Sequence, residues 1–518
     1  MDHYIIVDCG TGSGRAIIFN ELGEEIAISQ KEWIHKNFTG VPGAIDFDTK
    51  NNWTELKKII KDALDKSEID RNTIKAISAS SMREGMVLYD YDGKEIWACS
   101  NIDARAGKEA EDLIKKGIQL KLYNITGQTF SLSDAPRLLW VKRNLPTVYE
   151  KATRFGMLND WVVYKLSGVF SVEPSNVSTS GLFDTFKRGW SSEVFSDLGL
   201  KESMCPDVFE PGDFLGNILP ELAEEFCIPE DTAVIVGGGD VQIGTIGVGS
   251  VNEGDTCIFG GTFWQSEVNV KNPVPDEKAK VRINAHAIKN LFQYEGIAFQ
   301  VGQVMKWFRD SFCAEEKRIA NQLSISSFSL LSEMTKKVPA GSYGLIPIFS
   351  DIMNYQHWKH AAPAFINFDI NSPEKFGKAT FYKALMENAC FATKGNLEII
   401  SETSGHHLQR ATFAGGGSYS PEWAKILSDI LGIPIDIPKV KEATSLGNLI
   451  VCLVATGKFS DFNEAVDAIY KREMTCYPDM RTHEKYEEYY EKWKEVYRDA
   501  LKITDDKKLN HMWKAPGE

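Results

Sequence analysis

The stretch DCGTGSGR, from Asp8 to Arg15, follows the apolar run Tyr4–Val7 and leads directly into the run Arg15–Phe19. Glycine-rich turns after an apolar strand often bind nucleotide phosphates, but this one lacks the Gly-x-x-x-x-Gly-Lys-Ser/Thr pattern of a P-loop. A dinucleotide-binding turn opens a helix, whereas the β-branched residues after Arg15 predict a second strand. The stretch therefore predicts a glycine turn between two consecutive strands, where the backbone can closely approach a phosphate.

A similar arrangement occurs about halfway along the chain. The run Thr256–Phe259 is followed by the turn Gly260–Thr262 and then by Phe263–Val270. Strand–glycine–strand sequences are common, so coincidence is the alternative, but a Gly-Thr pair in both turns favours an internal repeat. A repeat on this scale predicts two related domains that face each other, and we place them at residues 1–250 and 251–518. One turn from each domain could then hold a triphosphate.

The composition disfavours several classes of function. The chain has 518 residues, of which 43% are hydrophobic and 25% charged, and its formal net charge is -14. This acidic balance argues against nucleic acid or an anionic membrane as the main partner. Nine cysteines without a Cys-x-x-Cys pair are typical of a reduced, cytoplasmic protein. We find no signal peptide and no run near the ~20 apolar residues of a membrane span, and expect a cytoplasmic protein.

Two aspartates follow predicted strands at positions suited to phosphoryl transfer. Asp240 comes after the strand Ala233–Val236 and three glycines, at the carboxyl end where open α/β sheets bind ligands. A carboxylate there could accept the proton of a hydroxyl that attacks a phosphate. Asp8 could hold water molecules around Mg²⁺. The alternatives are a helix-capping role for Asp240 and a turn-capping role for Asp8.

Further candidates lie in loops. The adjacent charges of Arg83 and Glu84 could hydrogen-bond hydroxyls or carbonyls of a small polar substrate, although a surface ion pair is the alternative. The glycine run Gly415–Ser418 precedes a predicted helix at Pro421–Leu431 and could bind a nucleotide. The histidines show no spacing typical of a metal site. The amphipathic stretch Tyr486–Leu501 predicts a terminal helix packed on its own domain.

Together the motifs resemble the FGGY family of carbohydrate kinases, within the actin-like ATPase fold. The matching stretches occur in the family's order between residues 8 and 447, and they are DCGTGSGR, SMREG, GGGDVQIG, FGGTFW, VGQVMKWFRD, FAGGGSYSPEW and EATSLG. The resemblance implies an α/β fold of two actin-like ATPase (ribonuclease H-like) domains facing a central cleft. It also implies transfer of phosphate from ATP to an alcohol, with Mg²⁺ as cofactor.

Within the family, the chain resembles the subgroup that acts on the signal molecule autoinducer-2. The stretches that carry this narrower resemblance are SMREGMVLY, WACSNIDARA, GQTFSLSDAPRLLW, GGTFWQ, WFRDSFCAEEK, PIFSD and HMWKAPGE. Xylulose kinases typically carry Met-His-Gly where this chain has Met82–Gly85. Glycerol kinases have two glutamines directly after the catalytic aspartate, where this chain has Val241 before Gln242. The resemblance implies phosphorylation of the terminal hydroxyl of open-chain 4,5-dihydroxy-2,3-pentanedione, a quorum-sensing signal.

The resemblance implies a role for each matching residue. Asp240 would be the general base, and Asp8 would hold the metal through water. The substrate would contact Arg83, Glu84, Gln242 and Trp264. ATP would be bound by Thr11, Gly12, Ser13, Gly260, Gly261, Thr262, Gly302, Gly415, Gly416, Gly417 and Ser418.

Two other functions stay open. One is a kinase for another small polyol or ketose, such as glycerol, xylulose or ribulose. The other is a non-catalytic actin-like nucleotide switch, because the same fold serves both kinases and such switches. Proteins of the phosphotransferase system control some members of the family, so the phosphocarrier HPr is an expected partner.

Overall fold

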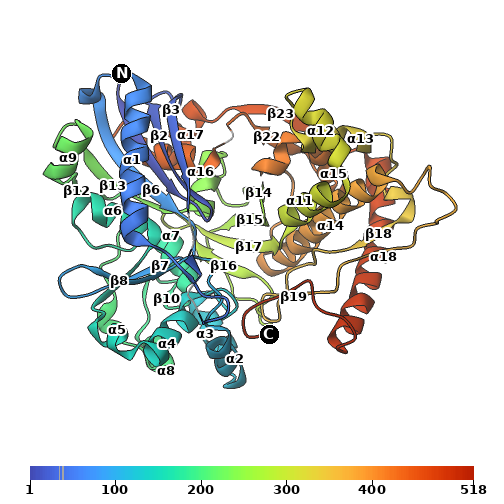
Figure 1. Cartoon of the computed structure of the whole chain (residues 1–518), viewed down its shortest axis with the longest axis horizontal. Helices are drawn as coiled ribbons and strands as arrows, with labels where there is room; N and C mark the ends of the chain where they lie inside the picture. The colour runs from blue at the N-terminus through green and yellow to red at the C-terminus, as the bar shows by residue number, and fades with distance from the viewer. Residues whose placement is uncertain (34–35, 38–39, 441) are drawn as a thin grey trace.

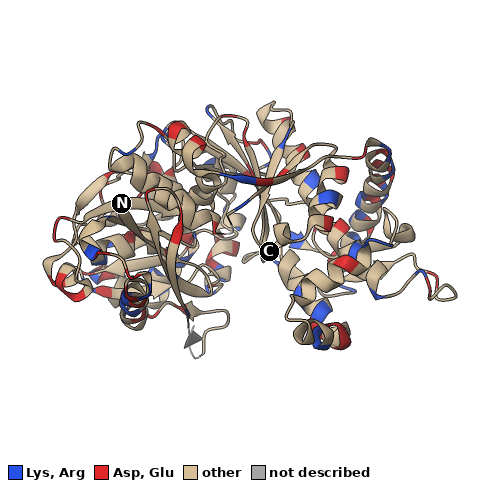
Figure 2. Cartoon of the chain, turned by 90° about the horizontal axis from the view of Figure 1, so that it is seen from above, with Lys and Arg blue, Asp and Glu red and all other residues tan. Residues whose placement is uncertain are grey.

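The computed structural model describes residues 1–33, 36–37, 40–440 and 442–518, which form two α/β halves side by side (Figure 1). In that view the N-terminal half lies on the left and the C-terminal half on the right. Seen from above, charged residues of both signs are interspersed over the outer helices (Figure 2). No helix in the described part of the chain is long and apolar enough to cross a membrane.

The N-terminal half is built on a six-stranded sheet of order β12-β13-β6-β1-β2-β3. Its strands are β1 His3–Cys9, β2 Ser13–Asn20, β3 Glu25–Glu32, β6 Ile74–Ser81, β12 Phe214–Asn217 and β13 Ala233–Gly239. Strands β1, β2 and β3 form an antiparallel meander, and β6 lies parallel to both β1 and β13. The Asp8–Arg15 stretch therefore joins two paired strands, as predicted, with no helix after the turn.

The C-terminal half is built on a seven-stranded sheet of order β16-β17-β15-β14-β21-β22-β23. Its strands are β14 Thr256–Gly260, β15 Trp264–Val270, β16 Arg282–Ala285, β17 Phe292–Ala298, β21 Ala411–Ala414, β22 Ile435–Pro438 and β23 Arg472–Cys476. Strand β14 pairs antiparallel with β15 and parallel with β21, as β1 pairs with β2 and β6. The predicted internal repeat is confirmed, and the turns Gly10–Gly14 and Gly260–Thr262 occupy equivalent places.

A third sheet enlarges the N-terminal half. Its order is β4-β5-β8-β7-β9, and its strands are β4 Lys36–Asn37, β5 Ile45–Asp46, β7 Met86–Tyr89, β8 Glu95–Cys99 and β9 Arg154–Met157. The remaining strands of the described residues form three two-stranded pairs: β10 Phe183–Asp184 with β11 Gly189–Trp190, β18 Ile346–Ile348 with β20 Ala364–Ile366, and β19 Lys359–His360 with β24 Trp513–Lys514.

Helices pack around these sheets in both halves. Those of the first half are α1 Thr49–Ser67, α2 Gly107–Lys115, α3 Gln119–Thr126, α4 Asp134–Asn144, α5 Pro146–Lys151, α6 Leu158–Ser167, α7 Pro174–Val177, α8 Ser192–Leu198, α9 Pro220–Phe226 and α10 Asp240–Gly247. Those of the second half are α11 Val301–Phe312, α12 Ala314–Gln322, α13 Ser327–Thr335, α14 Lys378–Ser404, α15 Pro421–Leu431, α16 Ala443–Ala455, α17 Phe462–Ile469 and α18 Met480–Asp505.

Helices α10 and α16 cross at the junction of the two halves through glycines. A Cβ atom at Gly447 would lie 1.9 Å from the carbonyl oxygen of Ile243, and one at Gly247 would lie 1.9 Å from that of Ala443. Although α16 comes late in the chain, its side chains share a core with β1 and β6 of the first sheet. Because this late helix packs on the earlier half, the packing of the helices does not mark a boundary at residue 250. The domain division there stays a prediction.

The end of the chain packs mainly on the second half. Along α18 the side chains of Tyr486, Tyr490, Trp493 and Tyr497 are buried, and they belong to the core of the C-terminal half. The predicted terminal helix and its packing are therefore confirmed. After α18 the chain turns back, and β24 brings the C terminus between the two halves (Figure 1, Figure 2).

Candidate active site

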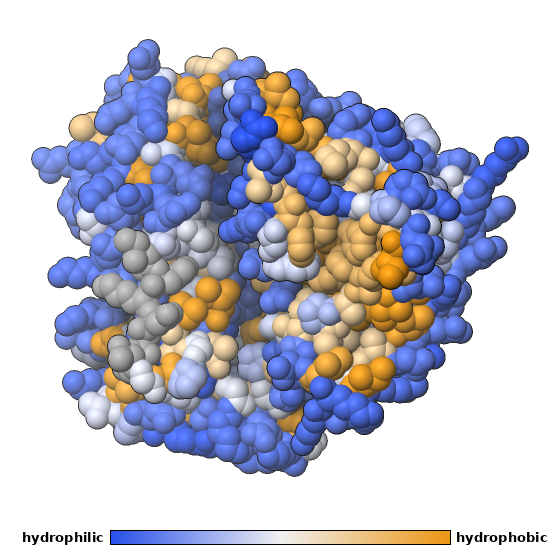
Figure 3. All heavy atoms as spheres, turned by 45° about the vertical axis from the view of Figure 1, so that its right-hand side comes forward, coloured by the Kyte–Doolittle hydropathy of each residue, from blue (hydrophilic) through white to orange (hydrophobic). Residues whose placement is uncertain are grey.

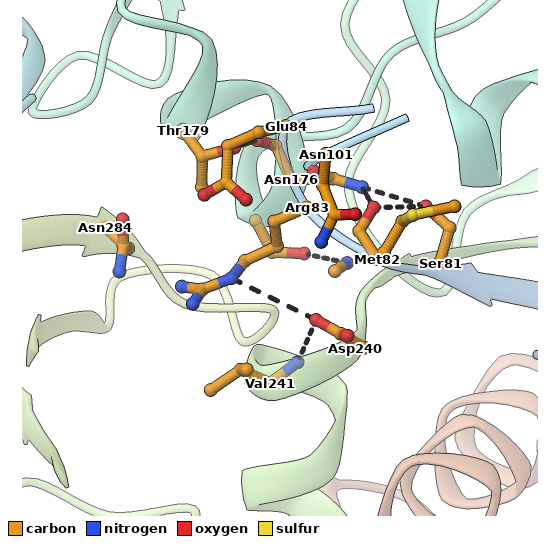
Figure 4. A network of polar contacts seen from close by, with 12 residues as sticks. Ser81, Met82, Arg83, Glu84, Asn101, Asn176, Thr179, Asp240, Val241 and Asn284 are labelled. Carbon is orange, nitrogen blue, oxygen red and sulfur yellow. Dashed lines mark hydrogen bonds and ion pairs between the residues drawn. The ribbon is translucent and has the colours of Figure 1, made fainter. Parts of the chain in front are cut away.

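The parallel strands of the first sheet bring three charged residues together at their carboxyl ends. Asp8 lies near the end of β1, Arg83 follows β6, and Asp240 follows β13 as the first residue of α10. Because β6 pairs with both β1 and β13 in parallel, all three strands end at one edge. Figure 4 shows the Arg83 and Asp240 side chains pointing toward each other.

The carboxyl group of Asp240 has a perturbed acidity. Burial raises the pKa of Asp240 to about 7, although the Arg83 guanidinium opposes the shift, and the charges of Asp8 and Glu84 add to it. The Arg83 Nε atom lies 4.0 Å from Oδ1 of Asp240, and the backbone N–H of Val241 donates to the same oxygen at 2.9 Å. The side chain is 34% exposed, and it lines a cavity between the halves.

Asp8 lies near the Asp240 carboxyl, and one of its own carboxylate oxygens is still available to accept a hydrogen bond or bind a cation. Its Oδ2 atom is 3.7 Å from Nε of Arg15, whereas its buried Oδ1 has no hydrogen-bond partner among the described residues. Arg15 in turn pairs with Glu442 from the second half. Burial raises the pKa of Asp8 to about 6, and Arg15 limits the rise. Asp8 therefore presents a carboxylate that a cation or bound water could satisfy.

Arg83 and Glu84 pair with the second half of the chain and not with each other. Two guanidinium nitrogens of Arg83 donate to the Glu295 carboxylate at 2.8 and 2.6 Å, and Glu84 accepts from Arg282. Burial alone would raise the pKa of Glu295, but the guanidiniums of Arg83 and Arg282 outweigh it and lower the pKa. The expected alternative of a surface ion pair is wrong, since both side chains are buried.

A cavity of about 560 Å³ lies over these residues, between the two halves. Arg83, Glu84 and Asp240 line it from the first half, and Thr11 enters it from the first glycine turn. Gly261 and Thr262 enter it from the second glycine turn. The space-filling view shows the surface hollowed between the halves, with hydrophobic residues gathered beside it (Figure 3).

A second cavity of about 700 Å³ adjoins the first through the second glycine turn. Gly260, Gly261 and Thr262 line it together with Gly302, Gly416 and Gly417. Its walls are mostly apolar, with side chains that include Met305, Phe328 and Tyr382. An apolar cavity next to a glycine turn fits a planar base whose phosphates extend toward the first cavity.

Some predicted nucleotide residues shape this cavity without lining it. The backbone of Gly415 has φ +82, and a Cβ atom there would lie 3.1 Å from the Gly260 carbonyl oxygen. The Ser418 hydroxyl donates to the Gly415 carbonyl at 2.8 Å. In the first turn Ser13 accepts a hydrogen bond from Gln30, and neither Gly12 nor Ser13 lines the two cavities.

The structure places two predicted substrate residues away from the first cavity. The Trp264 ring is buried, with ring centroids 4.9 Å from Phe413 and 4.7 Å from Trp423, and it lines the second cavity instead. Gln242 is fully buried, and neither polar atom of its amide has a hydrogen-bond partner in the described part of the chain. In this conformation, neither side chain reaches a substrate in the first cavity.

Sequence reasoning missed the residues that complete the first cavity. Arg282 and Gln265 come from strands of the second sheet, and Asn101 donates to the Thr11 hydroxyl at 2.9 Å. Trp513 and Pro516 line the same cavity from the end of the chain. The available signals were the stretches WACSNIDARA, GGTFWQ and HMWKAPGE, which contain Asn101, Gln265, Trp513 and Pro516 and resemble the subgroup, but no chemistry could be assigned to these residues from the sequence.

Two α/β domains of matching topology, each with a glycine turn aimed at a shared cavity, define an actin-like ATPase fold with a phosphotransferase site. More particularly, the chain belongs to the FGGY family of carbohydrate kinases. The N-terminal domain of that family matches residues 3–247, and the C-terminal domain matches residues 262–456.

The relatives cover the whole chain. It is 44% identical to the autoinducer-2 kinase of Escherichia coli (strain SMS-3-5 / SECEC), over 99% of this chain and 98% of that protein. It is 42% identical to the autoinducer-2 kinase of Yersinia enterocolitica, over 100% of this chain and 98% of that protein.

Solved structures share the fold at lower identity. The ligand-bound xylulose kinase from Lactobacillus acidophilus superposes with a TM-score of 0.86 at 20% identity, over 98% of this chain and 100% of that one. The Plasmodium falciparum glycerol kinase with ADP gives a TM-score of 0.83 at 19% identity, over 96% and 98%. Identities this low show the fold alone.

Proposed function

We propose that the protein transfers the γ-phosphate of ATP to the terminal hydroxyl of autoinducer-2, 4,5-dihydroxy-2,3-pentanedione. The observation that carries this proposal is the 42–44% identity to autoinducer-2 kinases over essentially the whole chain. Membership of a carbohydrate kinase family supports the reaction class, and the first cavity is large enough for a five-carbon acceptor.

Asp240 is the proposed general base. Its carboxylate would accept the proton of the acceptor hydroxyl as that oxygen forms its bond to the γ-phosphorus and ADP leaves. The neighbouring Arg83 supports this role, because its positive charge favours the ionised carboxylate that can accept a proton. Since Glu295 neutralises Arg83 through two hydrogen bonds, the guanidinium is held in place and does not compete for the transferred phosphate.

The two glycine turns would hold the nucleotide from both sides. Thr11 and Thr262 reach the first cavity from opposite halves, and Gly261 lies at the junction of both cavities. The base would occupy the second cavity, so the phosphates would point toward Asp240. This arrangement supports Thr11 and the second turn, Gly260–Thr262, as nucleotide residues, whereas Gly12 and Ser13 stay predictions.

The residues present fit a Mg²⁺ ion held through water. The buried Oδ1 of Asp8 lacks a partner among the described residues, and burial raises the pKa of Asp8, which a nearby cation would lower. No group of three metal-ligating side chains occurs in the ranges that the structure describes, which suits Mg²⁺, since it keeps most of its waters. When bound, Mg²⁺ would neutralise charge on the phosphates.

Release of ADP with a panel of acceptors tests the proposed function. The panel contains dihydroxypentanedione, glycerol, xylulose and ribulose, each at the same concentration. We expect the highest kcat/KM with dihydroxypentanedione and a phosphorylated product that carries phosphate on its terminal oxygen. A higher kcat/KM with glycerol or a ketose would contradict the proposed substrate. ATP turnover that no acceptor changes, together with filament formation, would instead favour an actin-like switch.

Cytoplasmic placement and control by HPr remain part of this proposal. The nine cysteines are free thiols, which agrees with a reducing compartment. A partnership with HPr rests on the family resemblance alone, and titration of the purified kinase with purified HPr tests it. No change in kinase activity or in heat of binding would remove HPr from the proposal.

A further inference from the structure

The last residues of the chain cross the space between the two halves. Strand β24 pairs with β19, so that Trp513 lies opposite His360 and Lys514 opposite Lys359. One residue further on, the Ala515 N–H donates to the Trp358 carbonyl at 2.9 Å, which fixes the course of the backbone. We call residues 513–518 the C-terminal strap.

The strap is anchored on the second half by its aromatic residue. The Trp513 ring lies with its centroid 4.0 Å from that of Phe299 and 5.0 Å from that of Trp358. Phe299 and Trp358 are themselves buried in the core of the second half, and Trp513 packs against that core. Trp513 therefore extends the core to the edge of the first cavity.

The other end of the strap touches the first half. Gly517 has φ +97, and a Cβ atom there would lie 3.0 Å both from Cβ of Ala110 and from the backbone nitrogen of Glu111. Both residues belong to α2. A side chain at Gly517 would meet both backbone strain and this close contact, so the glycine lets the strap reach α2.

The strap also forms one wall of the cavity that contains Asp240. Trp513, Lys514 and Pro516 line that cavity. Around Trp513 the wall is apolar, because Phe299 and Ile297 line the cavity as well. The charged side chains of Arg83 and Asp240 line it from the first half. Polar residues of the second half, Gln265, Arg282 and Lys514, line other parts of the cavity. The cavity thus offers an acceptor an apolar patch at Trp513, Phe299 and Ile297 within an otherwise largely polar lining.

This lining matches the chemistry of one acceptor in the proposed panel. 4,5-Dihydroxy-2,3-pentanedione carries hydroxyls at one end of its carbon chain and a methyl group at the other, whereas glycerol, xylulose and ribulose end in hydroxyls on both sides. An acceptor whose terminal hydroxyl meets Asp240 must place its far end elsewhere in the cavity. A methyl group gains from burial against aromatic rings, while a hydroxyl placed there would lose its hydrogen bonds to water.

We propose that the C-terminal strap is a specificity element that receives the methyl end of the acceptor, with Trp513 as its main contact. This inference rests on the proposed function, since it concerns the acceptor of the same site. The strap selects methyl ketones over polyols that carry a hydroxyl at the same place.

Two ketoses that differ only at this end give a direct test. 1-Deoxyxylulose ends in a methyl group where xylulose ends in a hydroxymethyl group. We expect the wild-type enzyme to favour 1-deoxyxylulose over xylulose in kcat/KM, and Trp513→Ala to lower that preference by roughly tenfold, the scale on which an apolar pocket discriminates. The kcat/KM for dihydroxypentanedione should fall by a similar factor, while KM for ATP should change by less than about twofold.

Matched variants separate recognition from folding. Trp53→Ala removes another half-buried indole, on α1 and outside both cavities. It should leave unchanged both the preference for 1-deoxyxylulose over xylulose and the kcat/KM for dihydroxypentanedione. Gly517→Val keeps the aromatic anchor and displaces only the far end of the strap. It should lower kcat/KM for dihydroxypentanedione even if Trp513→Ala does not fold. Thermal unfolding establishes which variants are folded.

The outcomes distinguish the two proposals. A wild-type enzyme that prefers glycerol or xylulose to dihydroxypentanedione contradicts the proposed function without reference to any variant. If the wild type uses dihydroxypentanedione but folded Trp513→Ala and Gly517→Val both keep its kcat/KM, only the role of the strap is overturned. Equal losses in kcat/KM for the acceptor and for ATP would also overturn it, because they would indicate a general defect.

Discussion

Asp240 combines a carboxyl of raised pKa that opens into the first cavity, a nearby guanidinium and a place at the start of α10. Replacing it with asparagine keeps the shape of the side chain but removes the group that accepts a proton. We expect Asp240→Asn to lower kcat by about 10²-fold or more, the contribution typical of general base catalysis, with little change in ATP affinity. Assays of ADP release and ATP titrations measure the two effects, and the exposed Asp231→Asn serves as control. Near-normal turnover would refute the base assignment.

The raised pKa of Asp240 gives the reaction a definite pH dependence. Because burial raises this pKa to about 7, the carboxyl is increasingly protonated below neutrality and can no longer act as a base. We expect kcat/KM to fall about tenfold per pH unit well below that pKa and to level off above it. A profile that stays flat from pH 5 to pH 8 would contradict the role of Asp240.

At the scale of elements, the crossing of α10 and α16 depends on residues without side chains. Because a Cβ at Gly447 would lie 1.9 Å from the Ile243 carbonyl oxygen, Gly447→Ala must push the helices apart. We expect the free energy of unfolding to fall by about 1–3 kcal/mol or more, as for other overpacked cores. Denaturant titration measures this loss. Gly189→Ala is the control, since the nearest heavy atom there is 3.9 Å away. Equal stability of the two variants would show that the crossing tolerates a methyl group.

The sequence predicted the elements that local patterns define, and it predicted less well the contacts that form between distant elements. The strand–turn–strand repeat follows from alternation and glycine placement, so both turns were predicted from residues alone. The partner of Arg83 could not be predicted, because Glu295 lies 212 residues further along the chain and becomes its neighbour only when the halves meet. Trp264 was misleading for a related reason: an indole beside a glycine turn serves equally well as a ligand contact or, as here, as part of an aromatic cluster.

For the whole molecule, buried titratable groups set how stability depends on pH. Burial raises the pKa of Asp134 and that of Glu173 to about 7, so the folded state binds protons that the unfolded state releases, and this stabilisation is lost as pH rises through about 7. Burial lowers the pKa of His286 and that of His360 to about 3. The unfolded state therefore binds protons that the folded state does not, and these histidines destabilise the folded state as the pH falls below their unfolded pKa of 6.5.

The carboxyl groups outweigh the histidines between pH 8 and pH 6, and Asp240 and Asp351, whose pKa burial also raises to about 7, act in the same direction. Their folded-state pKa near 7 lies in the middle of this window, whereas the unfolded value of 6.5 for the histidines lies near its lower end. We expect the free energy of unfolding to be larger at pH 6 than at pH 8 by at least about 1 kcal/mol, measured by denaturant titration at the two pH values. Glu173→Gln, which cannot bind the proton, should reduce the difference. A protein that is less stable at pH 6 would show that the histidines dominate.

The packing of α16 on the first sheet also has a consequence for synthesis on the ribosome. The inner face of β1 and β6 shares its core with Leu446, Leu449 and Ile450, residues that are translated after more than four-fifths of the chain. We expect the first half to emerge with that face uncovered and to stay so until α16 leaves the exit tunnel. Completion of the first sheet is therefore a late event in translation, and in this interval the nascent chain depends most on chaperones that cover apolar surface.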